Sequence, residues 1–154
     1  EETLHAMYEM KQPVFWFWPN VDAGADGTST GIRSFRETHD LVNFHFFKNM
    51  EPQDFLKLLS SSKGLIGNSS VGIRECAFMG VPVVNIGSRQ NNRERGKNVK
   101  DVGYSRLEIK NALNEIEVSP KPPVSTIYGN GNAGEKIAQL LKEVPLIFHK
   151  TITF

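Results

Sequence analysis

Short apolar runs alternate along the chain with segments whose apolar residues recur at helical spacing. Apolar runs of this length are typical of strands buried on both faces of a sheet. Strands are predicted at 14–18, 41–47, 63–67, 81–86 and 98–102. Helices are predicted at 1–11, 23–37, 52–61, 70–79, 105–116 and 133–144, with Asn132 as the cap of the last.

Strands that alternate with helices need crossover connections, and crossovers give parallel strands. The sequence therefore predicts an α/β fold, a Rossmann-like doubly wound parallel sheet with helices on both faces. With 154 residues, of which 39% are hydrophobic, the chain is long enough for one well-packed domain, 1–154, and too short for two. Ligands of such sheets bind beyond the carboxyl ends of the strands, where loops are predicted at 19–24, 48–51, 67–70 and 87–95.

Charge and cysteine content exclude several classes of function. The net charge is only +1, so no global field favours nucleic acid or an anionic membrane. The single cysteine, Cys76, excludes an internal disulfide framework, and the histidines lack metal-ligand spacing, so we expect no metal and no cofactor. No apolar run approaches the roughly 18 residues that span a bilayer. These features predict a cytoplasmic protein with neither nucleic-acid nor membrane partners.

The turn Gly67-Asn68-Ser69-Ser70 ends a predicted strand and opens a predicted helix. A phosphate would bind there readily, because first-turn amides lack intrahelical acceptors, the macrodipole is positive and serine hydroxyls add donors. The alternative is that Ser69 is only the N-cap. Gly72 favours a ligand, since a glycine in the first turn costs roughly 1 kcal/mol against alanine and close approach of a ligand or backbone is the usual reason.

Two charged residues extend this candidate site. Glu75 lies on the same predicted helix, and its carboxylate can accept hydrogen bonds from two vicinal hydroxyls; the alternative is a surface salt bridge with Arg74 or Arg89. Arg89 leaves the preceding predicted strand, and its planar guanidinium suits a phosphate. Residues 89–97 carry four cations, one anion and no aromatic residue, which indicates a phosphate-binding loop and argues against nucleic acid.

The motifs that carry a family resemblance are 19–24, 67–75, 80–90, 93–94, 96, 98–99 and 128–133. They resemble the hydrolysing UDP-N-acetylglucosamine 2-epimerases, which include bacterial sialic-acid pathway enzymes and the epimerase half of the animal bifunctional epimerase/kinase. The resemblance implies two facing Rossmann-like domains in the glycosyltransferase-B arrangement. It implies that this chain is the second, UDP-binding half, in accord with a start that has no initiator Met. The intact enzyme is then a homo-oligomer.

The resemblance also implies a reaction, in which UDP-N-acetylglucosamine and water give N-acetylmannosamine and UDP through a glycal. Ser69 and Ser70 hold the diphosphate, Glu75 the ribose hydroxyls and Arg89 a phosphate. The implied UDP-binding set is Asn20, Met50, Ser69, Ser70, Gly72, Glu75 and Arg89, with Asn20 facing the nucleotide sugar and the backbone near Met50 meeting the uracil. The catalytic carboxylates are expected upstream of the first residue, so Arg89 acts here as stabiliser of the leaving group.

Two other functions stay open. The chain could belong to a glycosyltransferase of the same architecture, which passes the sugar to an acceptor, or to a non-enzymatic UDP-sugar-binding module. The sugar is open as well, because Val71 and residues 76–79 vary from the choices common in bacterial members. A bacillosamine-type sugar is the second candidate substrate.

Overall fold

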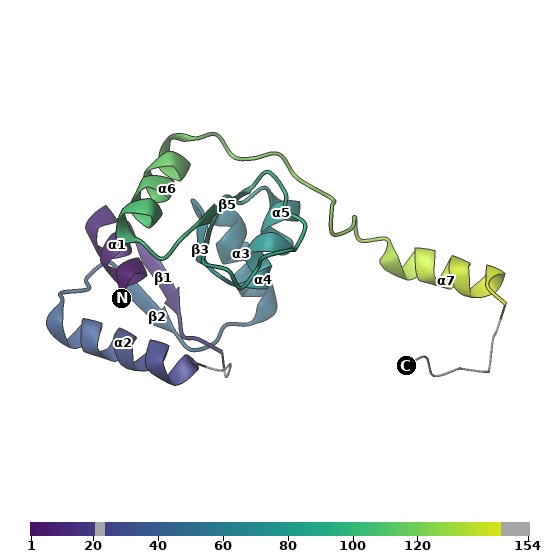
Figure 1. The fold of residues 1–154 in the computed structure, drawn as a ribbon. Coiled ribbons are helices and arrows are strands. Elements are labelled where there is room, and N and C mark those ends of the chain that lie inside the picture. The colour runs from purple at the N-terminus through teal and green to yellow at the C-terminus, as the bar shows by residue number, and fades with distance from the viewer. Residues whose placement is uncertain (21–23, 146–154) are drawn as a thin grey trace, which may run out of the picture.

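The computed structural model describes residues 1–20 and 24–145, where seven helices and five strands alternate (Figure 1). In chain order they are α1 (Glu2–Met10), β1 (Val14–Phe17), α2 (Ala25–Thr38), β2 (Phe44–Phe47), α3 (Pro52–Ser61), β3 (Leu65–Gly67), α4 (Ser70–Ile73), α5 (Glu75–Met79), β4 (Val83–Ile86), β5 (Val99–Val102), α6 (Arg106–Val118) and α7 (Ala133–Glu143). All five predicted strands are present within their predicted ranges. Ala23, the predicted start of the second helix, lies outside the described residues.

The strands form two parallel sheets rather than one continuous sheet. β1 pairs with β2, and β4 lies between β3 and β5. Within the described ranges, β1 has no second neighbour and β3 pairs only with β4. The alternation of strands and helices predicts the parallel direction correctly. It does not specify which strands become neighbours, because that depends on how the crossover helices pack.

Helices cover both faces of the β3-β4-β5 sheet. Val84 and Ile86 of β4 belong to one buried cluster, which includes Ile109 of α6, whereas Val83 belongs to a second with Leu59 of α3. Successive residues of a strand point to opposite faces, so neighbouring valines enter different clusters. The predicted α/β architecture with helices on both faces is therefore confirmed.

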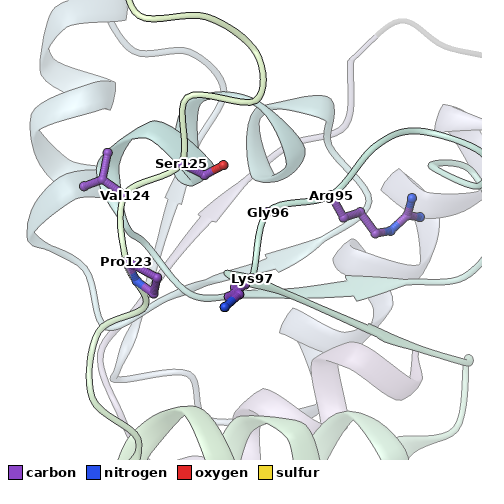
Figure 2. A pocket seen from close by; sticks show the side chains of 6 residues that line it. All are labelled: Arg95, Gly96, Lys97, Pro123, Val124 and Ser125. Carbon is purple, nitrogen blue, oxygen red and sulfur yellow. The ribbon is translucent and has the colours of Figure 1, made fainter.

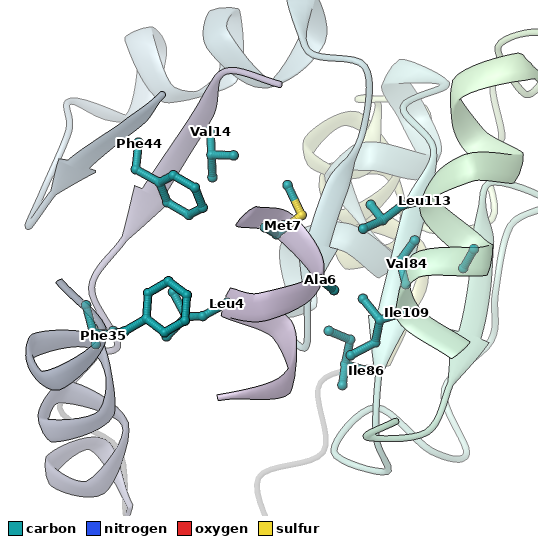
Figure 3. Packing of buried hydrophobic residues seen from close by; sticks show 12 residues of the cluster. Leu4, Ala6, Met7, Val14, Phe35, Phe44, Val84, Ile86, Ile109 and Leu113 are labelled. Atoms are coloured by element: carbon teal, nitrogen blue, oxygen red, sulfur yellow. The ribbon is translucent and has the colours of Figure 1, made fainter. Parts of the chain in front are cut away.

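The first helix joins the two sheets. Leu4, Ala6 and Met7 of α1 are buried in the cluster that reaches from Phe44 of β2 to Val84 of β4. Figure 3 shows α1 between these groups, with the aromatic side chains on one side of it and the β4 and α6 side chains on the other. The amphipathic pattern at the start of the chain is explained by this shared apolar core.

The last helix extends away from the other elements (Figure 1). No residue of α7 is buried, and its apolar Ile137, Leu140 and Leu141 are exposed. Asn132 occupies the N-cap position as predicted, but its side chain makes no capping hydrogen bond. Neither α7 nor any other helix in the described part of the chain is long and apolar enough to cross a bilayer.

Candidate functional site

The candidate site lies at the carboxyl ends of β3 and β4. These strands are neighbours, with Gly67 opposite Asn85, so the loops that follow them start side by side. The Gln90 side-chain amide donates a hydrogen bond to the Asn68 carbonyl over 2.8 Å and joins the two loops. The residue after Asn68 and the residue before Gln90 are the predicted phosphate ligands Ser69 and Arg89. The structure therefore brings both candidate loops to one corner of the sheet.

The serine turn caps a helix much shorter than predicted. Ser69 is the N-cap of α4, and its hydroxyl accepts a hydrogen bond from the Val71 amide over 3.4 Å, so the capping alternative is observed. Residues 70–79 form two short helices, because the backbone at Arg74 turns to φ −100° and ψ −72°. The dipole of a four-residue helix is small. Anion binding at this turn must therefore rely on amides, hydroxyls and a nearby cation.

Gly72 has a packing role that the sequence did not predict. It is buried, and a Cβ at this position would lie 2.9 Å from Val83 Cγ1 and 3.3 Å from Leu65 Cδ2. Its amide donates to the Ser69 carbonyl over 3.1 Å inside the first turn. The close approach that requires glycine here is that of α4 to the sheet, so Gly72 is explained without a ligand.

Gly72→Ala is expected to lower the free energy of unfolding by about 1 kcal/mol, because overpacking costs about 1 to 3 kcal/mol and alanine returns up to about 1 kcal/mol of helix propensity. Urea denaturation measures the change. Gly31→Ala is the matched control, since this helical glycine of α2 has nothing within 4 Å of its Cβ position. The control should be stabilised, and equal stabilisation of both variants would contradict the packing role.

Glu75 is the first residue of α5, and one of its two carboxylate oxygens is buried. Its side chain is partly buried, and Oε2 is buried with no hydrogen-bond partner among the described residues. A buried acceptor without a partner costs free energy, so a ligand donor would stabilise it. Burial raises the pKa of the next residue, Cys76, to about 12, and the Glu75 carboxylate adds to this effect. Cys76 therefore stays a protonated thiol at neutral pH.

Arg89 is exposed in the loop that follows β4. The loop leaves the strand at Gly87, whose φ of 76° favours glycine. A Cβ on Gly87 would also collide with the ring and hydroxyl of Tyr104, which follows β5. Glycine at this position thus lets the loop turn closely past its neighbour and carry Arg89 to the carboxyl edge of the sheet.

The remaining predicted ligands lie on the other sheet. Asn20 is exposed after β1, and Met50 is partly buried after β2. The Met50 amide donates to Asn49 Oδ1 over 2.9 Å. Residues 21–23 of the predicted 19–24 loop lie outside the described residues. The structure groups Ser69, Ser70 and Arg89 at β3 and β4, and places Asn20 and Met50 at the carboxyl ends of β1 and β2.

A shallow hollow of about 250 Å³ lies between residues 95–97 and the extended segment 123–125 (Figure 2). The hollow is formed where the Ser125 amide donates to the Ala77 carbonyl over 2.9 Å and holds the segment beside α5. Its lining residues do not include Ser69, Glu75 or Arg89. The predicted ligands therefore lie outside this hollow.

The family model described as UDP-N-acetylglucosamine 2-epimerase matches residues 1–142. The chain belongs to this family. The resemblance predicted from the motifs is thereby confirmed.

Two curated members of the epimerase family are similar to this chain. UDP-N,N'-diacetylbacillosamine 2-epimerase (hydrolyzing) of Legionella pneumophila is 38% identical over 128 residues, which are 83% of this chain and 33% of the relative. UDP-N-acetylglucosamine 2-epimerase of Neisseria meningitidis is 32% identical over 104 residues, 68% of this chain and 26% of the relative. The chain therefore spans a third or less of the length of these two relatives.

A solved epimerase structure has the same fold. UDP-GlcNAc 2-epimerase of Methanocaldococcus jannaschii, in complex with UDP-GlcNAc and UDP, matches with a TM-score of 0.66 at 17% identity. The match covers 93% of this chain and 41% of that one. This likeness confirms the Rossmann-like fold class that was predicted for the chain.

Three polar residues of this epimerase-family chain, Asn85, Asn98 and Asp101, received no role from the sequence, and Arg95 was predicted only as one cation of the 89–97 loop. Asn85 donates to Asp101 across β4 and β5 over 2.6 Å, and Asp101 Oδ2 lies 2.7 Å from Arg95 Nε. The buried Asn98 donates to the carbonyls of Gly72 and Val81, both over 3.2 Å. The feature of the sequence that could have indicated this network is Asn85, an asparagine inside the apolar run that forms β4. A polar residue buried there needs a partner, although its identity could not be predicted.

Proposed function

We propose that residues 1–154 are one domain, the C-terminal, UDP-binding half of a hydrolysing UDP-N-acetylglucosamine 2-epimerase. Family membership supports an epimerase, and the name of the Legionella relative supports the hydrolysing type. The observation that carries the assignment to this half is the Gln90–Asn68 hydrogen bond of 2.8 Å, which joins the serine turn to the Arg89 loop. Hydroxyls, amides and a guanidinium at one corner suit a diphosphate.

Each candidate residue receives a role in this proposal. Ser69, Ser70 and Arg89 bind the diphosphate, and Glu75 accepts hydrogen bonds from the ribose hydroxyls. Glu75 Oε2 has no hydrogen-bond partner in residues 1–20 and 24–145, which supports this role, because two vicinal hydroxyls would supply donors. Asn20 and Met50 are proposed contacts to the sugar and the uracil, made from the carboxyl ends of β1 and β2. Gly72 supports α4 against the sheet and is not proposed as a ligand.

The reaction divides between this corner and residues outside the chain. A base removes the proton from C2 of the sugar while the C1–O bond breaks and UDP leaves with the electron pair, giving a glycal. Water then adds across the double bond, with hydroxyl to C1 and a proton to C2. We assign proton transfer to residues outside this chain. Negative charge grows on the departing phosphate oxygen, and donors placed there in advance, from Arg89 and the serines, stabilise it.

The test incubates the natural protein that contains these residues with UDP-N-acetylglucosamine and with UDP-N,N'-diacetylbacillosamine, in water without an acceptor. NMR of the products should show a free 2-epimerised sugar and UDP, and the preferred substrate identifies the sugar. Release of UDP only when an acceptor is added would indicate a transferase, and binding without release a non-enzymatic module. The 154-residue chain alone should bind UDP without releasing sugar.

A further inference from the structure

We propose that Gln90 and Arg95 are positioning residues, which hold Arg89 against the serine turn so that both contact one diphosphate. This inference rests on the proposed function and adds two residues to it. Neither side chain is proposed to touch the ligand. Their role follows from the hydrogen bonds that they make inside the 87–97 loop and across to the loop before α4.

Gln90 provides the bond between the two candidate loops. It is only 3% exposed, although most of the loop around it is exposed. Its Nε2 donates to the Asn68 carbonyl over 2.8 Å, between positions 22 residues apart in the chain. Consecutive Cα atoms lie about 3.8 Å apart, so this bond restricts the positions of Arg89 and Ser69 relative to each other.

Arg95 closes the other end of the loop. One terminal nitrogen donates to the Gln90 carbonyl over 2.7 Å and the other to the Arg93 carbonyl over 2.5 Å. Its Nε lies 2.7 Å from Asp101 Oδ2, and the side chain is 21% exposed. The Arg95 guanidinium thus donates hydrogen bonds to two carbonyls and forms an ion pair with one carboxylate. We therefore infer that Arg95, although part of the cationic cluster, orders the loop instead of binding phosphate.

The network is anchored in the sheet. Asp101 of β5 also accepts a hydrogen bond from Asn85 of β4 over 2.6 Å. These two strands are paired directly, with Asn85 opposite Asp101. The contacts thus run from the paired strands through Arg95 to Gln90 and across to Asn68. A loop fixed in this way loses little further conformational freedom when a ligand binds, which favours affinity and precise placement of charge.

A buried oxygen of Gln90 indicates that this side chain does not contribute to the stability of the fold. Its Oε1 is buried and has no hydrogen-bond partner in the described part of the chain. Burial of an acceptor without a partner destabilises the fold, and an apolar side chain of similar length would avoid that cost. Replacing Gln90 with an apolar residue should therefore change ligand binding more than folding.

The experiment measures binding of UDP and of uridine to Gln90→Met and Arg95→Lys variants of the natural protein that contains these residues. Methionine keeps the unbranched shape without the donor, and lysine keeps the charge without the planar fork. Both variants should bind UDP about fivefold to tenfold more weakly, bind uridine as the wild type does and melt at a similar temperature. Gln139→Leu, on the exposed α7, is the control for glutamine removal and should behave as wild type.

A double variant tests whether Gln90 acts through Arg89. Gln90→Met combined with Arg89→Lys should bind UDP little more weakly than Arg89→Lys alone, because the positioned group is already altered. Wild-type UDP affinity in both Gln90→Met and Gln90→Leu, or equal losses for uridine and UDP with a lowered melting temperature, would overturn the positioning role. A wild-type protein that binds no UDP would instead overturn the proposed function, and this inference with it.

Discussion

Glu75→Ala is expected to weaken UDP binding about tenfold and to leave pyrophosphate binding unchanged. The proposed contacts of this carboxylate are to the ribose, and a hydrogen bond to a charged group contributes about 1.5 to 3 kcal/mol. Pyrophosphate has no ribose, so it reports the serine turn and Arg89 alone. Isothermal titration of the natural protein with both ligands measures the two effects separately.

Stability provides a second readout for the same variant. Because Glu75 Oε2 is buried and has no hydrogen-bond partner among the described residues, its removal should leave the melting temperature unchanged or raise it. Glu117→Ala is a charge-matched control, since this exposed glutamate lies in the last turn of α6 and outside the candidate site. Equal loss of UDP and pyrophosphate binding, with a lower melting temperature, would show that the carboxylate is structural.

Local sequence pattern predicts the elements of this fold well and their assembly only in part. An apolar run marks β4 best, because this parallel strand is buried at every position, whereas β5 carries two exposed charged residues between its valines. The predicted helix at 70–79 is wrong in one respect, since the backbone at Arg74 divides it, and helical spacing continues across such a break. The separation into two sheets could not be predicted either, because local pattern does not determine which strands pair.

The candidate site, like the fold, could be predicted from the sequence only in part. The rule that ligands bind beyond the carboxyl ends of parallel strands selects Ser69 and Arg89, and the pairing of β3 with β4 brings their loops together. The packing of Gly72 against the sheet could not be predicted, because a buried glycine looks the same in sequence whether a strand or a ligand approaches it. The contacts of Gln90 and Arg95 join residues distant in the chain through specific rotamers, and no local pattern specifies those.

Arg89→Lys in the natural protein is expected to lower kcat about tenfold and to raise KM much less. Lysine retains the charge but loses the planar fork that binds two phosphate oxygens. If the guanidinium contributes most when charge grows on the departing UDP, its loss affects the transition state more than the bound substrate. Steady-state release of UDP from UDP-N-acetylglucosamine gives both constants. An equilibrium titration with UDP, whose terminal phosphate already carries the charge that grows on the leaving group, should show a loss close to that in kcat.

The competing interpretation is that Arg89 pairs with Glu94 and only orders the loop. Under that interpretation, Arg89→Lys would leave UDP binding and kcat unchanged while the loop became more sensitive to proteolysis. Arg93→Lys is the matched control, because Arg93 is an exposed arginine of the same loop whose hydrogen bonds in the described part of the chain use its backbone amide and carbonyl. A tenfold loss of kcat in Arg89→Lys, with neither a kinetic change in Arg93→Lys nor new proteolysis, would assign the leaving-group role to the Arg89 guanidinium. The opposite pair of results would remove Arg89 from the site and leave the serine turn as the diphosphate contact of this half.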